Sequence, residues 1–174
     1  MVEHVEEARP IVRWIRSDEL EVYREFRLRA LAEAPYAFGD SLAAARSRPE
    51  SFWVDRVAQT SAGVTSVLFA AVEASTDRWL GMTGCYLEDD PSEAMVVSVW
   101  VDPIARGRGL AGRLVLAARD WAAERGVRRL KLWVTATNER PQRVYRAAGF
   151  EYTGTRRPLP SDPSLDELEM AMSL

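Results

Sequence analysis

Two residue types that carry much of enzyme chemistry are nearly absent from this sequence. Its 174 residues include one cysteine, Cys85, and one histidine, His4. An internal disulfide, a thiolate zinc site and every multi-histidine metal site are therefore excluded. The histidine stands in an acidic N-terminal segment, which also excludes Ser/His/Asp and Cys/His nucleophilic catalysis. We expect no metal ion, and we expect Cys85 to be an inert, half-buried strand thiol.

The chain also lacks a long apolar run and a strong charge of either sign. No stretch approaches the ~20 apolar residues that a membrane span needs, and the N-terminus has neither the basic start nor the apolar segment of a secretory signal. A net charge of -3 with 47% hydrophobic residues disfavours disorder and a broadly basic nucleic-acid-binding surface. We expect a cytoplasmic protein with no membrane or nucleic-acid partner. An acidic leader, 1–10, would precede a single domain, 11–174, and a homodimer is compatible with these features.

The apolar pattern predicts an α/β architecture. Helices are expected at 19–34, from 49 onward, at 109–125 and at 139–148, and strands at 11–16, 65–73, 79–87, 95–101, 130–134, 150–155 and 165–172. The helix between the strands at 95–101 and 130–134 makes a right-handed crossover, so those two strands are predicted to be parallel. A loop is expected at 158–163.

The most informative motif is the glycine-rich turn from Arg106 to Gly112, between a strand and an amphipathic helix. Backbone N–H groups at a helix N-terminus have no intrahelical partner, and the helix dipole favours an anion there. Glycines let the backbone approach a phosphate closely, while Arg106 and Arg108 add charged donors. Residues 105–146 carry 11 Lys+Arg and 3 Asp+Glu, against a net charge of -3 for the whole chain. This asymmetry indicates a polyanionic ligand.

Two other interpretations of the turn are available. Its GxGxxG string also fits a dinucleotide-binding fingerprint. Residues 102–106 separate the string from the preceding strand, however, and the next strand ends without an acidic residue, which disfavours this interpretation. The remaining alternative is a glycine turn with only a structural role.

Two blocks of sequence resemble the GCN5-related N-acetyltransferases. The first is Val99 to Pro103 followed by Arg106-Gly107-Arg108-Gly109-Leu110-Ala111, which matches the family's Arg/Gln-x-x-Gly-x-Gly/Ala motif for acetyl-coenzyme A. The second is Leu132 to Asn138, continued by Tyr145 to Phe150. Over residues 99–150 the order and spacing of the blocks are similar to those of the family.

The resemblance implies an α+β, GNAT-like acyl-coenzyme A N-acyltransferase fold with helices on both faces of a mixed, mostly antiparallel sheet. One parallel strand pair would splay around acetyl-coenzyme A, and a bulge is expected in the strand that ends at Val101. Asn138 would bind the cofactor arm, although Asn also suits a helix N-cap. The cofactor-binding residues implied are Val99, Trp100, Val101, Arg106, Gly107, Arg108, Gly109, Leu110, Ala111, Gly112 and Asn138.

The resemblance assigns one catalytic residue and leaves another open. Tyr145 matches the tyrosine that protonates the departing thiolate, a role suited to a phenol with a pKa of ~10; its alternative is a core aromatic. Relatives often carry a glutamate near the start of the strand before the turn, where this chain has Met95, which cannot take a proton. Glu93 and the acids at 88–90 are more typical of a solvated turn, so the general base is unassigned.

The implied activity is direct acetyl transfer from acetyl-coenzyme A to a primary amine of a small molecule or peptide, in a ternary complex. The alternative is a non-catalytic coenzyme A-binding sensor module, because the turn is present while no base is identified. Acceptor specificity is expected from the helices within 19–60 and from the loop at 155–165. The candidate residues on the helices are Arg27, Arg29, Tyr36, Phe38 and Trp53.

Overall fold

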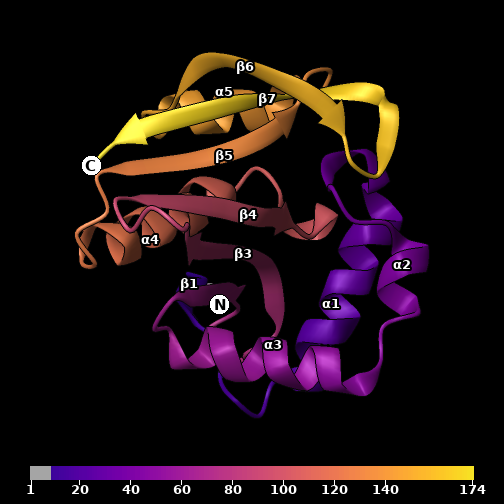
Figure 1. Ribbon diagram of the computed structural model, residues 1–174. Helices are drawn as coiled ribbons and strands as arrows, with labels where there is room; N and C mark the ends of the chain where they lie inside the picture. Colours follow the sequence, from indigo (N-terminus) through magenta and orange to yellow (C-terminus); the bar gives the residue numbers. More distant parts are fainter. Residues whose placement is uncertain (1–8) are drawn as a thin grey trace, which may run out of the picture.

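The computed structural model describes residues 9–174 (Figure 1); His4 and most of the predicted leader lie outside this range. Seven strands form one sheet in the order β1-β2-β3-β4-β5-β7-β6. All neighbouring strands are antiparallel except β4 and β5, which are parallel. The mixed, mostly antiparallel sheet predicted from the sequence is therefore confirmed. The strands are β1 (Ile11–Trp14), β2 (Ser66–Val72), β3 (Trp79–Leu87), β4 (Glu93–Val101), β5 (Arg129–Thr135), β6 (Glu151–Leu159) and β7 (Asp162–Ser173).

Helices cover both faces of the sheet (Figure 1). Successive side chains of a strand point to opposite faces, and β2 illustrates the division: Val67 and Phe69 pack in the cluster of α4, whereas Leu68 and Ala70 pack in the cluster of α1 and α3. Within residues 9–174, no helix has the length and apolar character needed to cross a membrane. The helices are α1 (Leu20–Glu33), the 3-10 turn η1 (Pro35–Ala37), α2 (Leu42–Arg46), α3 (Glu50–Ala62), the 3-10 turn η2 (Pro103–Ala105), α4 (Leu110–Ala123) and α5 (Glu139–Ala147).

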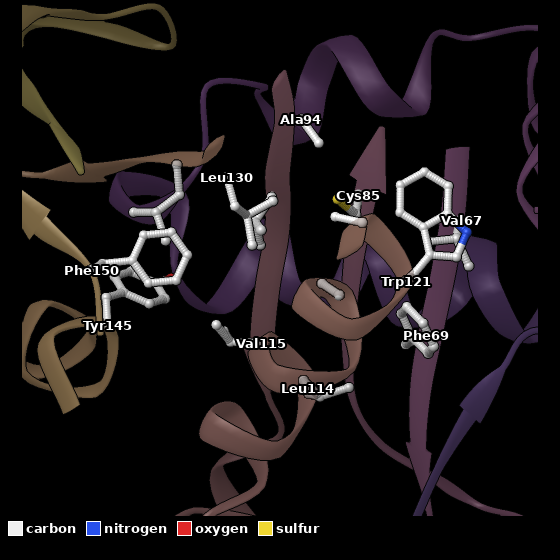
Figure 2. Close-up of a cluster of buried hydrophobic side chains, with 14 of the residues drawn as sticks. Val67, Phe69, Cys85, Ala94, Leu114, Val115, Trp121, Leu130, Tyr145 and Phe150 are labelled. Carbon is white, nitrogen blue, oxygen red and sulfur yellow. The ribbon is translucent and has the colours of Figure 1, made fainter. Parts of the chain in front are cut away.

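Helix α4 anchors the side of the sheet where the glycine turn lies. Its apolar residues recur at helical spacing, and Leu114, Val115 and Trp121 are buried against the strands (Figure 2). Cys85 belongs to the same cluster. The thiol is fully buried rather than half-buried, and desolvation raises its pKa to about 12. The start of α4, and with it the glycine turn, is thus held by a well-packed core.

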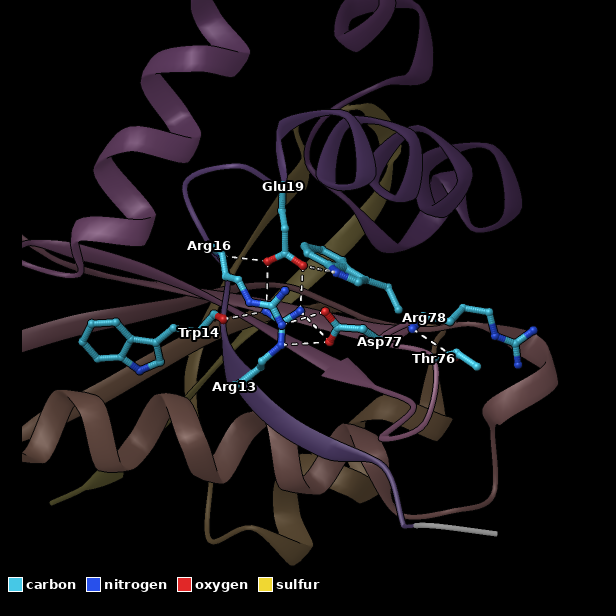
Figure 3. Close-up of polar contacts among 8 residues, drawn as sticks. Arg13, Trp14, Arg16, Glu19, Thr76, Asp77 and Arg78 are labelled. Carbon is cyan, nitrogen blue, oxygen red and sulfur yellow. Dashed lines mark hydrogen bonds and ion pairs between the residues drawn. The ribbon is translucent and has the colours of Figure 1, made fainter.

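An ionic cluster fixes the N-terminal end of α1 on the other face (Figure 3). The Glu19 carboxylate accepts hydrogen bonds from the Arg13 guanidinium at 2.7 and 2.9 Å, from the Arg16 N–H at 2.7 Å and from the Trp79 indole at 3.1 Å. Asp77, in the turn between β2 and β3, also binds Arg13, at 2.9 Å. Because the carboxylate of Glu19 is nearly buried, these bonds connect β1, α1 and β3 firmly.

The loop predicted at 158–163 is shorter in the structure. β6 continues to Leu159 and β7 begins at Asp162, so the connection is a tight hairpin. Pro158 disfavours a strand in the sequence pattern, but β6 lies at the edge of the sheet, where proline is tolerated. The longer strands bring residues of the expected 155–165 loop onto the sheet itself.

Candidate active site

The two parallel strands separate at their C-terminal ends. The register of β4 with β5 runs from Glu93 opposite Arg129 to Val96 opposite Leu132. β4 nevertheless continues to Val101 and β5 continues to Thr135. Main-chain groups of β4 beyond Val96 that point toward β5 therefore have no strand partner on that side.

The bulge expected in β4 is present. Met82 pairs with Trp100 and Gly84 pairs with Val97, so Ser98 and Val99 together oppose Thr83. Ser98 adopts a left-handed conformation with φ 57°, which is uncommon for a residue other than glycine and re-aims the strand. The bulge and the parting of the strands occur at the same level of the sheet.

A cavity of about 420 Å³ lies where the strands part, between the glycine turn and α5. Its lining includes Tyr145 and every predicted cofactor-binding residue except Arg108, which is exposed on the turn. The residues predicted from the sequence therefore lie together around one cavity. The other lining residues, which the prediction did not assign to the cofactor site, are Ala34, Tyr36, Ala37, Ala105, Trp133, Val134, Thr135, Arg140, Pro141 and Val144.

The glycine turn presents backbone donors to this cavity. α4 begins at Leu110, and its N-cap, Gly109, provides no side-chain cap, nor does the first turn contain an acid. Gly107 and Gly109 have φ values of 81° and 72°, a left-handed conformation that glycine adopts without strain. A Cβ built on either residue would meet no atom within 4 Å. Uncapped N–H groups beside open space are the donor set that binds phosphate groups at helix N-termini.

The side chain of Arg106 holds the turn in place. Its guanidinium donates to Glu33 of α1 at 2.7 Å and to the Val101 carbonyl at 3.0 Å. Glu33 also accepts from the Trp100 indole at 3.0 Å. The bond from Arg106 lowers the pKa of Glu33, so this carboxylate stays charged and paired. The turn is thereby tied to the end of α1 on the opposite face.

Asn138 and Tyr145 enter the cavity from the α5 side. Asn138 occupies the N-cap position of α5 but makes no capping hydrogen bond with its side chain. Tyr145 is 6% exposed and packs edge-on against Phe150, with ring centres 6.2 Å apart (Figure 2). Burial raises the pKa of its hydroxyl, so the phenol is protonated at neutral pH. Tyr145 is thus both a core aromatic and a cavity residue.

A second cavity, of about 460 Å³, lies on the face of the sheet that α1 covers. Ala37 and Trp133 line both cavities, so the two adjoin where β4 and β5 part. The residues that line the second cavity are Arg27, Ala37, Phe38, Gly39, Tyr86, Glu88, Met95, Val96, Val97, Ser98, Lys131, Trp133, Arg157, Glu167 and Glu169.

Most charges of the second cavity are paired with one another. Lys131 binds Glu88 and Glu93, the latter at 2.6 Å. Arg157 binds Glu167 at 2.5 Å and lies 3.9 Å from the centre of the Trp133 ring. The carboxylate of Glu169 accepts a hydrogen bond from the Thr153 hydroxyl at 2.8 Å. Glu169 forms no ion pair with a lysine or arginine of residues 9–174.

The acceptor residues expected from the helices divide into three groups. Arg27 and Phe38 line the second cavity, and Tyr36 lines the first. Arg29 instead binds Asp102. Trp53 is buried against Tyr23, with ring centres 5.8 Å apart, and lines neither cavity.

The sequence analysis missed four residues of the second cavity that lie on β5 and β7. Lys131 and Trp133 alternate on β5, and Glu167 and Glu169 alternate on the paired strand β7. This alternation places all four on one face of the sheet. A polar or aromatic residue at every second position of a central strand is the signal that could have found them.

The sequence pattern of the Acetyltransferase (GNAT) family matches residues 15–150, which include the turn, the bulged strand and Tyr145. This chain belongs to the Acetyltransferase (GNAT) family. Solved structures of the GNAT fold agree with the observed topology. An acetyltransferase of the family from Streptococcus pneumoniae superposes with a TM-score of 0.80 at 15% identity, over 95% of this chain and 100% of that one.

Two further proteins illustrate the range of similarity. An acetyltransferase of Salmonella typhimurium, solved with its cofactor acetyl-CoA, has a TM-score of 0.77 at 15% identity and covers 96% of this chain and 95% of its own. Mycothiol acetyltransferase of Nocardia farcinica is 36% identical over 86 residues, which are 48% of this chain and 28% of that protein. This chain spans less than a third of the length of the curated relatives it matches.

Proposed function

We propose that residues 11–174 form one domain that transfers an acetyl group from acetyl-coenzyme A to a primary amine. One observation carries this proposal: two cavities of different chemistry meet where β4 and β5 part. The first offers uncapped backbone donors and a buried phenol, which suit a coenzyme thioester. The second contains Glu169, a carboxylate without a cationic partner among residues 9–174, which suits an ammonium group.

The first cavity would hold the cofactor through main-chain groups. N–H groups from Gly107 to Gly112 would bind the diphosphate at the start of α4. The edge of β4 beyond Val96 would bind the amides of the pantetheine arm, since its groups toward β5 lack a strand partner. Asn138, which makes no capping bond, has its side-chain amide available for the same arm.

The transfer itself needs three proton movements: the nitrogen of the acceptor loses two protons, and the sulfur gains one. The acceptor arrives as an ammonium ion, and Glu169 would take a proton from it. This carboxylate has no cationic partner among residues 9–174. It also stands opposite Trp133, which lines both cavities. The neutral nitrogen then bonds to the thioester carbon, and the carbon–sulfur bond breaks. The hydroxyl proton of Tyr145 passes to the departing sulfur, and the second proton that the nitrogen loses as the amide forms returns to the Tyr145 oxygen. Main-chain N–H groups near Val99 to Val101 would stabilise the charge that develops on the carbonyl oxygen.

Two measurements test this proposal. Calorimetry with acetyl-coenzyme A reports cofactor binding, and release of free coenzyme A thiol in the presence of a panel of primary amines reports transfer. Binding together with amine-dependent thiol release supports the transferase. Binding without release by any amine contradicts it and supports a coenzyme A-binding sensor module instead. Absence of binding contradicts both.

A further inference from the structure

Arg27, on the face of α1 that meets the sheet, is an incompletely paired cation. Its side chain is 11% exposed, and the guanidinium lies 4.7 Å from the centre of the Phe38 ring. Nη2 is 3.8 Å from Asp40, whose carboxylate lies closer to Arg48, at 3.0 Å. Nη1 has no hydrogen-bond partner, and among the buried side-chain nitrogens and oxygens of residues 9–174 it is alone in this state.

A buried guanidinium with an unsatisfied donor destabilises the folded protein unless an acceptor completes its hydrogen bonds. A buried donor without an acceptor loses its hydration and gains nothing in exchange. Desolvation also lowers the pKa of Arg27, the direction expected for a cation with insufficient counter-charge. Since Arg27 lines the second cavity, a ligand in that cavity can supply the missing acceptor.

The other charges of the cavity narrow the chemistry of this ligand. Lys131 and Arg157 each have a glutamate close by, at 2.6 and 2.5 Å, whereas the ion pair of Arg27 with Asp40 is long, at 3.8 Å, and its buried Nη1 has no acceptor. Of the carboxylates that line the cavity, Glu169 is the one that forms no ion pair within residues 9–174. The cavity therefore lacks one negative and one positive charge, and a zwitterion supplies both.

We propose that the amine acceptor is an amino acid or a closely related zwitterion, with its carboxylate bound by Arg27 and its ammonium group beside Glu169. This proposal names the class of acceptor for the proposed function. It rests on that function because the ammonium group is the one that would be acetylated. A planar guanidinium binds a carboxylate through two parallel hydrogen bonds. A phosphate monoester, with close to two negative charges, would need a second cation that has no glutamate close by. A simple amine would leave Arg27 Nη1 without an acceptor.

The experiment compares matched pairs of acceptors that differ only in the carboxyl group. α-, β- and γ-amino acids are each set against the amine that remains after decarboxylation, for example leucine against isopentylamine and phenylalanine against phenethylamine. Binding is followed by the shift in melting temperature, and turnover by thiol release from acetyl-coenzyme A. The proteins are wild type, Arg27→Met, Arg27→Lys and the control Arg24→Met. Arg24 lies on the same helix and lines neither cavity.

The expected result is that an amino acid stabilises the wild type more than its amine does. The preference in kcat/KM should be ~10- to 100-fold, the size of a charge-assisted hydrogen bond. Arg27→Met should abolish the preference by raising KM with little change in kcat, whereas Arg24→Met should retain it. Arg27→Lys should restore part of it, because it keeps the charge without the paired donors.

Two results would overturn the proposal. In the first, no amino acid raises the melting temperature of the wild type above the value reached with its amine. In the second, Arg27→Met keeps the carboxylate preference. Failure of the proposed function is visible separately: if no acceptor releases thiol, the transferase is contradicted, while the carboxylate-dependent shift in melting temperature still decides the role of Arg27.

Discussion

Replacing Tyr145 by phenylalanine separates the packing role of this side chain from the acid role proposed for it. The ring belongs to the buried cluster and packs against Phe150, while the residue also lines the cavity proposed for the cofactor. Phenylalanine keeps the ring and removes only the hydroxyl proton. Packing should therefore survive, and only the acid should be lost.

The structure sets the expected magnitudes. Because the ring contact is retained, the free energy of unfolding should change by less than about 1 kcal/mol. Loss of a general acid lowers turnover by ~100- to 10,000-fold, which corresponds to about 3 to 5.5 kcal/mol of transition-state stabilisation. Because the proposed acid would act in the transition state, kcat and kcat/KM should fall together while the Kd for acetyl-coenzyme A stays nearly constant.

The assay is thiol release under saturating cofactor, with cofactor affinity measured separately by calorimetry. Tyr152→Phe is the matched control. The hydroxyl of Tyr152 donates to Gln142 Oε1 at 2.6 Å, and the residue lines neither cavity. It should keep wild-type turnover. Unchanged kcat in Tyr145→Phe, or equal losses in kcat and cofactor affinity, would refute the acid role.

Three other substitutions test the remaining parts of the argument. Gly109→Val should weaken acetyl-coenzyme A binding ~10-fold or more. The control Gly126→Val, at the other end of α4, has a similar φ of 75° and equally open surroundings and should not weaken it. Equal losses of affinity in calorimetry would contradict the phosphate assignment. Glu169→Gln should lower kcat ~100-fold near neutral pH in the thiol-release assay, and a kcat equal to that of the wild type would exclude Glu169 as the base. Glu19→Ala should lower the free energy of unfolding by about 3 kcal/mol at pH 7, measured with urea, and a loss below 1 kcal/mol would show that the cluster of Figure 3 contributes little.

The pH dependence of the Glu19 effect follows from its pKa. Desolvation opposes ionisation of Glu19, but hydrogen bonds from Arg13, the Arg16 N–H and Trp79 outweigh it and hold the pKa below the usual 4.5. A carboxyl group whose pKa is lowered in the folded state stabilises the protein above its unfolded-state pKa. The difference between wild type and Glu19→Ala should therefore be complete above about pH 4.5 and should shrink as the pH falls further. A difference that grows on acidification would contradict this reasoning.

The sequence by itself determined the features that depend on neighbouring residues. β3 has the predicted bounds, Trp79–Leu87, and α4 begins one residue after the glycine that was expected to open it. The cavity proposed for the cofactor was predictable because its lining comes largely from two short blocks of sequence, one around the turn and one from β5 to α5. Hydrophobic period, glycine placement and the family motif are local signals, and local structure follows them.

Only the tertiary structure decided the second cavity and its charges. Arg27 is in an ordinary helical pattern, and nothing adjacent to it in the sequence shows that Nη1 lacks a partner or that Glu169 faces the same space. The lining comes mainly from α1, β3, β4, β5, β6 and β7, and the place of each strand depends on its register with its neighbours. Which charges pair depends on their distance in space, so the acceptor class that we propose could be inferred only from the folded arrangement of these strands and α1.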